Sequence, residues 1–308
     1  MAVELGWVLQ PTSRTPENSL ALDEHNRRHL AALRPPFTTL WVEDHVQWDE
    51  LPTLECWTAL TYTAAEFPAL KVGTLTLGQS YRNPALTAKM AATLQWLSGG
   101  RLILGIGAGW KEDEYLAYGY PYPGAGTRIA QLREAVEIIR RMWSESPASF
   151  AGQYFTIKDA YCEPRPDPPP PILIGGSGPR KTMRVVAELA DWWNGNFSPL
   201  DAYRAKVATL HEHCAAIGRD PAEITLSYYG HVAVGHEPDQ AERVDPVRPR
   251  IYRIAGTPDE VAAELNGFID FGVEHFMLKF ADFPNLDQFH LFMDEVVPKL
   301  ELRMRNAE

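Results

Sequence analysis

Residues 71–107 have the sequence KVGTLTLGQSYRNPALTAKMAATLQWLSGGRLILGIG, which predicts one helix between two apolar strands. Asn83 and Pro84 suit the N-cap and first turn of this helix, because the asparagine oxygen accepts from free amides and proline lacks an amide that would go unbonded. Gly99 and Gly100 are expected to end the helix. Its buried stripe is expected to consist of Leu86, Met90, Leu94 and Leu97. A strand–helix–strand unit of this kind is typical of a parallel sheet.

The same alternation of apolar runs and helical patterns continues along the whole chain. Eight runs are predicted to be strands: Leu5–Gln10, Thr39–Glu43, Lys71–Leu77, Arg101–Ile106, Pro171–Gly175, Asp191–Gly195, Ile224–Val234 and His275–Phe280. Several are apolar throughout, as strands covered on both faces are. The pattern predicts an α/β fold, a (β/α)8 TIM barrel, as a single domain over residues 1–308.

Two segments interrupt the alternation. Residues 144–170 contain FAGQYF, which predicts a hairpin, and then the proline-rich CEPRPDPPPP. Residues 235–250 are polar and acidic. Long insertions in barrels commonly decorate the C-terminal face, so both are expected there, with residues 144–170 shaping the substrate pocket.

Composition narrows the possible partners. The formal net charge of −11 disfavours nucleic acids and anionic membranes, because both are repelled by an acidic protein. No stretch approaches the roughly 18 apolar residues of a membrane span, and the N-terminus lacks the features of a secretory signal. Three scattered cysteines are typical of reduced thiols. The expected location is therefore cytoplasmic, and the expected partner is a small molecule.

The second predicted strand ends in the polar residues Asp44 and His45. Side chains at the carboxyl ends of barrel strands can reach the central cavity. There His45 could donate to a ring or act as a general acid or base, and Asp44 could orient it or bind a polar cofactor edge. The alternative is structural, with Asp44 capping a turn and His45 hydrogen-bonded within a loop.

A glycine run follows the fourth strand as Gly107, Ala108 and Gly109, after Gly105. Glycines at this place would let a flat ring or a phosphate approach the backbone, although such runs are also found in plain tight turns. The dinucleotide fingerprint G-x-G-x-x-G is excluded, because its last glycine would fall at Trp110. Further along, Glu114 and Tyr118 are one helical turn apart and would point the same way.

A second glycine run, GGSGPRK, follows the apolar run PILI. Gly176, Ser177 and Gly178 would present free amides and a hydroxyl to an anion at the start of a helix. Nearby basic residues are Arg180, Lys181 and Arg184. This arrangement predicts a phosphate site, the alternative being a glycine turn beside solvated charges. Lys279, at the end of the last strand, could face the cavity, but it is expected to extend into solvent.

Five segments together resemble the luciferase-like superfamily, and most closely its F420-dependent branch. They are VEDHV (42–46), GTLTLGQSYRNPALTAKMAATLQWLSGGRLILGIGAGWKEDEYLAYGYPYP (73–123), RIAQLREAVEIIRRMW (128–143), PPPPILIGGSGPRKTMRVVAELADWWN (168–194) and GTPDEVAAELNGFIDFGVEHFMLKF (256–280). The resemblance covers nearly the whole chain. It implies a barrel that binds the deazaflavin F420, or alternatively FMN, at its C-terminal mouth.

The resemblance also implies roles for individual residues. It places Asp44 and His45 as catalytic residues near the cofactor ring. Behind the ring it implies a bulge with a non-proline cis peptide at Leu75 and Thr76. The remaining cofactor-binding residues that it implies are Gly107, Ala108, Gly109, Gly176, Ser177, Gly178 and Arg180. Relatives are often homodimers.

One position departs from the sugar-phosphate dehydrogenases of this family. They carry a catalytic glutamate where Trp110 stands, so a small, more apolar substrate is expected in a pocket formed by Trp110, Glu114 and Tyr118. The expected activity is hydride transfer between F420 and that substrate. The alternatives are an FMN-dependent monooxygenase that uses O2 and a non-catalytic cofactor-binding barrel. No metal is expected, because only Asp44 and His45 qualify as ligands at strand ends.

Overall fold

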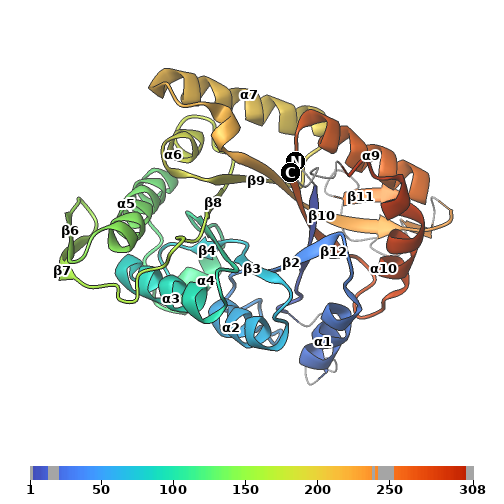
Figure 1. The fold of residues 1–308 in the computed structure, drawn as a ribbon, viewed down its shortest axis with the longest axis horizontal. Helices are drawn as coiled ribbons and strands as arrows, with labels where there is room; N and C mark the ends of the chain where they lie inside the picture. Colours follow the sequence, from blue (N-terminus) through green and yellow to red (C-terminus); the bar gives the residue numbers. More distant parts are fainter. Residues whose placement is uncertain (1–2, 13–20, 238–239, 242–252, 303–308) are drawn as a thin grey trace.

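The computed structural model describes residues 3–12, 21–237, 240–241 and 253–302. Eight parallel strands form a closed barrel (Figure 1). In order around the barrel they are β1 (Glu4–Val8), β2 (Phe37–Val42), β3 (Lys71–Thr74), β5 (Leu102–Gly107), β8 (Ile172–Gly175), β9 (Trp192–Asn196), β10 (Thr225–Val234) and β12 (His275–Phe280). Pairing of β10 with β12, and of β12 with β1, completes the circle. The predicted TIM barrel is confirmed, with a strand at each of the eight predicted places.

Helices surround the strands (Figure 1). They are α1 (Leu22–Ala32), α2 (Cys56–Glu66), α3 (Pro84–Leu97), α5 (Ala125–Ser144), α6 (Thr182–Leu189), α7 (Leu200–Ile217), α9 (Pro258–Phe271) and α10 (Asp287–Leu291). A short helix, α4 (Glu112–Ala117), lies in the loop after β5. Among the described helices, none combines the length and apolar character needed to cross a membrane.

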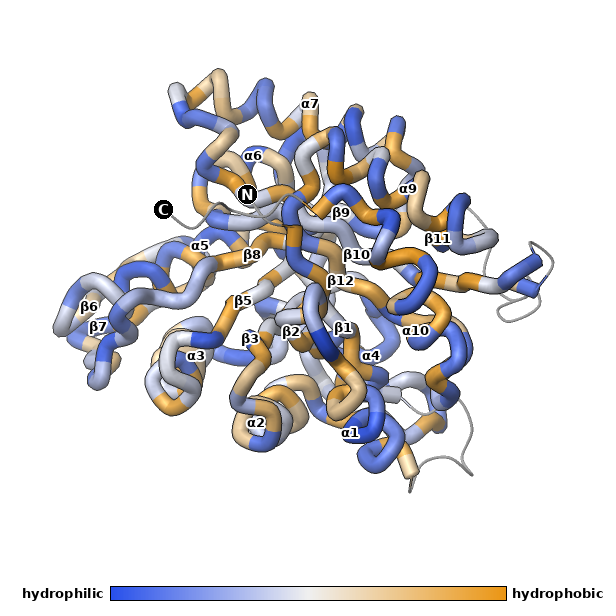
Figure 2. The backbone as a smooth tube through the Cα atoms, turned by 45° about the vertical axis from the view of Figure 1, so that its right-hand side comes forward, coloured by the Kyte–Doolittle hydropathy of each residue, from blue (hydrophilic) through white to orange (hydrophobic). Residues whose placement is uncertain are grey.

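Apolar side chains fill both sides of the sheet, and the strands at the centre are largely hydrophobic in Figure 2. The larger cluster lies between the strands and the helices. A smaller cluster contains Val8, Trp41, Leu75, Ile103, Leu173, Tyr229 and Met277, from six of the barrel strands and the segment after β3. The barrel interior is therefore packed, as in other barrels of this kind, and a ligand cavity can open only at an end.

Helix α3 begins as predicted, with the Asn83 oxygen accepting from the amide of Ala85 at 2.9 Å. Its buried face differs from the expected leucine stripe. Leu86 is 53% exposed and Leu97 is 66% exposed. The buried residues are Pro84, Thr87, Ala88, Ala91, Ala92, Leu94 and Gln95. Small side chains let α3 lie close against α5, so three of the predicted stripe positions are not buried.

The insertion at residues 144–170 contains the predicted hairpin, formed by β6 (Ala148–Ala151) and β7 (Thr156–Ala160). The carboxylate of Glu134, in α5, accepts from the backbone amide of Tyr154 at 2.9 Å and so holds the hairpin against that helix. The insertion joins the end of α5 to the start of β8, and none of its residues lines the cavity at the strand ends. The expectation that it shapes the substrate pocket is wrong.

Most of the second predicted insertion, at residues 235–250, lies outside the described residues. After it, β11 (Arg253–Gly256) pairs in parallel with the C-terminal half of β10. All three cysteines are buried free thiols, as expected. They are Cys56, Cys162 and Cys214.

Candidate active site

A cavity of about 1060 Å³ opens at the carboxyl ends of the barrel strands. Each of the eight strands contributes to its wall, either directly or through the one or two residues that follow it. One lining residue from each, in ring order, is Gln10, Glu43, Leu75, Gly107, Gly175, Asn196, Tyr229 and Lys279. Barrel enzymes carry their active sites at this end, so the cavity is the candidate active site.

The cavity brings together most of the residues that the sequence singled out. They are Asp44, His45, Leu75, Thr76, Gly107, Ala108, Gly109, Trp110, Glu114, Gly176 and Gly178. The side chains of Ser177 and Arg180 do not line it. Tyr118 also lies outside, because α4 ends at Ala117 and the Tyr118 hydroxyl donates to the carbonyl of Val46 at 3.0 Å. The prediction of Tyr118 as a pocket residue is wrong.

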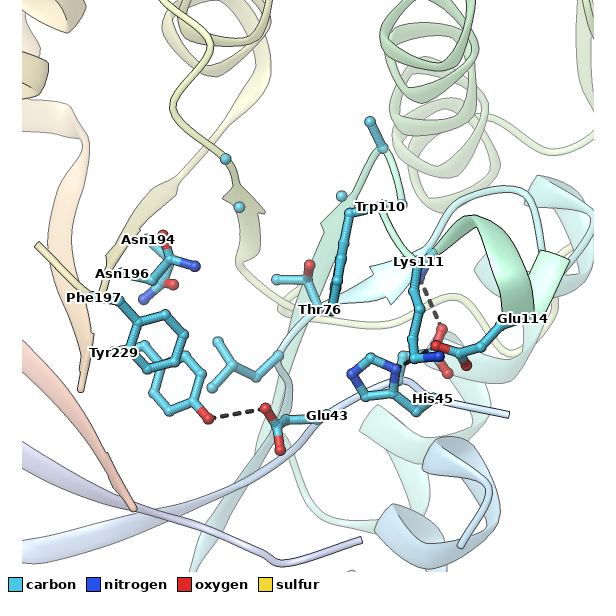
Figure 3. A pocket seen from close by; sticks show the side chains of 18 of the residues that line it. Glu43, His45, Thr76, Trp110, Lys111, Glu114, Asn194, Asn196, Phe197 and Tyr229 are labelled. Atoms are coloured by element: carbon cyan, nitrogen blue, oxygen red, sulfur yellow. Dashed lines mark hydrogen bonds and ion pairs between the residues drawn. The ribbon is translucent and has the colours of Figure 1, made fainter. Parts of the chain in front are cut away.

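His45 is held by Glu114, which is completely buried. Nδ1 of His45 lies 2.6 Å from Oε1 of Glu114, and the other carboxylate oxygen accepts from the amide of Val46 at 2.7 Å. A carboxylate only accepts, so this contact assigns the proton to Nδ1 and leaves Nε2 available. Figure 3 shows the imidazole turned so that its far side faces the cavity. The indoles of Trp48 and Trp110 meet the ring edge-on, with centroids 4.9 and 5.9 Å away.

Asp44 has a structural partner instead of His45. Its carboxylate accepts two hydrogen bonds from the guanidinium of Arg82, each 3.0 Å long, and one from the amide of Gly78 at 2.8 Å. Burial alone would lower the pKa of Arg82, but the Asp44 carboxylate outweighs it and raises that pKa. The expectation that Asp44 orients His45 is therefore wrong, and Glu114 does so.

The chain after β3 lines the cavity at a non-proline cis peptide between Leu75 and Thr76, which confirms the expected cis bond. This peptide separates β3 from β4 (Leu77–Gly78), so the third predicted strand is interrupted. The Thr76 side chain projects into the cavity (Figure 3). A Cβ at Gly107 would lie 2.8 Å from the Thr76 hydroxyl, and one at Gly175 would lie 3.0 Å from its methyl group.

The glycines of the first run are therefore needed for packing within the protein itself, whether or not a ligand is bound. At Gly105 a Cβ would lie 1.9 Å from the carbonyl oxygen of Thr74, so a side chain there would collide with β3. The amide of Gly105 donates to the Thr74 hydroxyl at 2.9 Å. Sequence alone suggested that these glycines make room for a ring, and only Gly107 and Gly109 retain that option, because they line the cavity.

The second glycine run forms a turn between β8 and α6. Gly176 has a φ of +116°, a conformation that favours glycine. Within the part of the chain that the structure describes, the amides of Gly176, Ser177 and Gly178 donate to no protein atom. Gly176 and Gly178 face the same cavity as His45. Several free amides converging at one turn make a site for an anion such as a phosphate.

A second polar cluster, absent from the predicted site, lies on the same cavity: Glu43, Tyr229, His231 and Lys279. The Lys279 ammonium lies 2.5 Å from Oε2 of Glu43, and the Tyr229 hydroxyl donates to Oε1 at 2.9 Å (Figure 3). Lys279 is buried, so its expected extension into solvent is wrong.

The alternation of β12 could have revealed this position of Lys279. Side chains alternate along a strand, and Met277, two positions earlier, belongs to the cluster inside the barrel. Lys279 is two positions after Met277, so its side chain points into the barrel too.

Among the described residues, no three histidine, cysteine or carboxylate side chains come together to hold a metal ion.

Comparison with known proteins agrees with this geometry. The model of the luciferase-like monooxygenase family matches residues 3–270. The chain is 30% identical over 303 residues to a protein of Kineococcus radiotolerans named F420-dependent glucose-6-phosphate dehydrogenase, covering 85% of this chain and 88% of that protein.

Two solved structures share the fold. One is an F420-dependent secondary alcohol dehydrogenase in complex with an F420–acetone adduct, with a TM-score of 0.82 and 20% identity, covering 98% of this chain and 100% of that one. The other is the oxygenating constituent of 3,6-diketocamphane monooxygenase from Pseudomonas putida in complex with FMN, with a TM-score of 0.75 and 18% identity over the same shares of both chains. From its fold, its cavity and its sequence, the chain belongs to the luciferase-like monooxygenase family.

Proposed function

We propose that this protein transfers a hydride between coenzyme F420 and a small, largely apolar organic substrate. One observation carries the proposal: a buried His45–Glu114 pair and a turn share a single cavity, and the turn's Gly176 and Gly178 line that cavity with amides that have no partner among the described residues. An anion site and a proton-transfer group at one barrel mouth are what a phosphate-bearing redox cofactor and its substrate need. The names of the Kineococcus relative and of the alcohol dehydrogenase point to F420.

The residues present fit such a cofactor. The amides of residues 176–178 would hold its phosphate, and Leu75, Thr76 and Gly107–Gly109 would lie against its ring. A cavity of about 1060 Å³ is at the upper end of the range for ligand pockets, roughly 300–1,000 Å³. When bound, F420 supplies a ring carbon that accepts or donates the hydride.

The charges outside the cavity favour F420 over FMN. Arg180 and Lys181 follow the anion-binding turn and are exposed. Arg184 is paired with Glu188 at 2.9 Å, so it adds less free charge. Two exposed cations beyond the phosphate site suit a cofactor with a long anionic tail, which F420 has and FMN lacks.

His45 is the group that would move the proton. When an alcohol is oxidised, the hydride leaves carbon and the hydroxyl proton must go to a base. Nε2 of His45 is available for it, because Glu114 holds the proton on Nδ1. In the reverse direction the protonated ring donates to the carbonyl oxygen. Glu114 also stabilises the imidazolium, and the indoles of Trp48 and Trp110 shield the pair from water.

A cofactor titration tests the proposal. Purified apoprotein is titrated separately with F420 and with FMN, and binding is followed by fluorescence. We expect saturable binding of F420, at lower concentrations than FMN. Ser177→Glu, which places a carboxylate on the turn without altering a glycine, should weaken binding of either cofactor, while the distant surface variant Ser149→Glu should not.

Two results would contradict the proposal. Binding of FMN without binding of F420 would indicate a flavin-dependent monooxygenase instead. Binding of neither cofactor would remove the basis for hydride transfer altogether. If F420 binds and His45→Asn retains full turnover, the cofactor assignment stands and the role of His45 is wrong.

A further inference from the structure

The cavity has a second polar region, formed by Glu43, Tyr229 and Lys279, that the proposed hydride transfer does not use. Glu43 follows β2, while Tyr229 and Lys279 belong to β10 and β12. Figure 3 shows the Glu43 carboxylate between Tyr229 on one side and His45 on the other. A substrate whose reacting group contacts Nε2 of His45 would therefore extend over this cluster.

Charge is balanced within the cluster. Burial alone would raise the pKa of Glu43, but the Lys279 ammonium and the Tyr229 hydroxyl outweigh it and hold that pKa below its ordinary value. The carboxylate is thus an anion at neutral pH, and the lysine beside it compensates one negative charge with one positive charge. A cavity wall of this kind offers strong hydrogen-bonding groups and an ion pair.

Glu43 retains capacity for another donor. Its two oxygens accept one hydrogen bond each from protein, Oε1 from Tyr229 and Oε2 from Lys279. A carboxylate has about four lone-pair sites, so it can also accept a substrate hydroxyl. A phosphate or carboxylate at the same place would meet the Glu43 anion in a cavity of low dielectric, where like charges repel strongly.

Of the remaining cations of the cavity wall, one is paired with a carboxylate and the other lies near the anion-binding turn. Among the described lining residues they are Lys111 and Arg128. Lys111 is paired with Asp113, and Arg128 donates to the carbonyl of Pro123 with its guanidinium over the ring of Tyr122. Arg128 has no acidic partner among the described residues, and its Nε has no hydrogen-bond partner there. It belongs to the first turn of α5, where Gly126 lies against Lys181 beyond the anion-binding turn, so its charge is on the side of the cofactor phosphate and not beside Glu43.

From these contacts we infer that the Glu43–Lys279 pair selects an uncharged substrate with a hydroxyl or carbonyl group and rejects phosphorylated substrates. The inference rests on the proposed function, because it assumes that the cofactor occupies the cavity beside the glycine turn. A preference for uncharged substrates would distinguish this chain from the relatives that are named for glucose 6-phosphate. Glu43 acts as a specificity-determining residue, with Lys279 and Tyr229 holding its carboxylate in place.

The test is the binding of glucose 6-phosphate to F420-loaded protein, measured by calorimetry so that no turnover is required. The cofactor then fills the phosphate site at residues 176–178. Glu43→Gln keeps an acceptor for Tyr229 and removes the negative charge beside Lys279, so we expect its affinity for glucose 6-phosphate to exceed that of the wild type at least tenfold. In the double variant Glu43→Gln/Lys279→Met this gain should disappear. The affinity for F420 should be the same in all three proteins.

Two outcomes would overturn the inference alone, and a third would overturn the proposed function as well. Equal affinity of wild type and Glu43→Gln for glucose 6-phosphate would overturn the inference and leave the proposed function intact. So would turnover of glucose 6-phosphate by the wild type in preference to neutral alcohols such as 2-propanol and cyclohexanol. If F420 fails to bind the wild type, the proposed function itself is wrong and the inference falls with it.

Discussion

Lowering the pH from 6.5 to 4 should destabilise the protein because of one buried histidine, His275 in β12. It is 1% exposed, and its Nε2 lies 3.1 Å from the indole nitrogen of Trp41 and 3.0 Å from the hydroxyl of Thr39. Its Nδ1 has no hydrogen-bond partner among the described residues. Burial lowers the pKa of this imidazole from 6.5 to about 4, although the nearby carboxylate of Glu4 acts in the opposite direction.

The sign and size of the effect follow from linkage. Between pH 6.5 and 4 the unfolded chain binds a proton at His275 and the folded protein does not, so the free energy of unfolding decreases as the pH falls through this window. One pKa unit corresponds to about 1.4 kcal/mol, which gives a total loss of about 3 kcal/mol at pH 4 and none above pH 6.5. A domain is stable by about 5–15 kcal/mol in all, so the loss is measurable.

Urea denaturation followed by tryptophan fluorescence, at several values from pH 7 to pH 4, provides the assay. Other groups titrate too, so the quantity of interest is the difference in unfolding free energy between wild type and His275→Gln. Glutamine keeps an acceptor for Trp41 and Thr39 but does not titrate. We expect this difference to change by about 3 kcal/mol in favour of the variant between pH 7 and pH 4. A difference that does not vary with pH would refute the reasoning.

Three further predictions concern the site and its surroundings. Glu114→Gln should reduce turnover with F420 about ten- to hundredfold without changing cofactor affinity, because the loss of one of its two strong hydrogen bonds costs about 1.5–3 kcal/mol. Unchanged turnover would contradict this role, and so would nitrogen NMR that shows the same His45 tautomer in the variant. Asp44→Ala should lower the unfolding free energy by about 1.5–3 kcal/mol, because it removes both hydrogen bonds between Asp44 and Arg82 and leaves only Glu55 to pair with the guanidinium. A variant that is as stable as the wild type but inactive would show instead that Asp44 is catalytic. Burial raises the pKa of Asp282 to about 6, so the folded state favours its neutral form and the carboxylate costs stability as the pH rises from 3.8 through 6. Asp282→Asn should therefore be more stable than the wild type by about 1–3 kcal/mol at pH 7, with the gain vanishing below pH 4 in thermal or urea melts.

Local sequence was sufficient to predict the strands and the places where chemistry gathers. Apolar runs such as His275–Phe280 predict strands because a strand covered on both faces must be apolar. The end of β2 and the two glycine runs were identified because parallel strands bring their carboxyl ends to one face. These are properties of short segments, so they can be identified from the sequence without knowledge of the fold.

Pairing across the barrel was decided only by the tertiary structure. Glu43 meets Tyr229 and Lys279, which are 186 and 236 residues away along the chain. Such contacts exist because the barrel closes between β1 and β12, and no local pattern contains that closure. The same holds for Glu114, which the sequence placed in the pocket but did not pair with His45.

The sequence by itself therefore determined the barrel, its open end and the residue types gathered there. The tertiary structure decided which of those residues hold one another and which face the cavity. The physical reason is that burial and helix or strand periodicity act over a few residues, whereas an ion pair or hydrogen bond depends on the separation of atoms that only the closed barrel brings within about 3 Å.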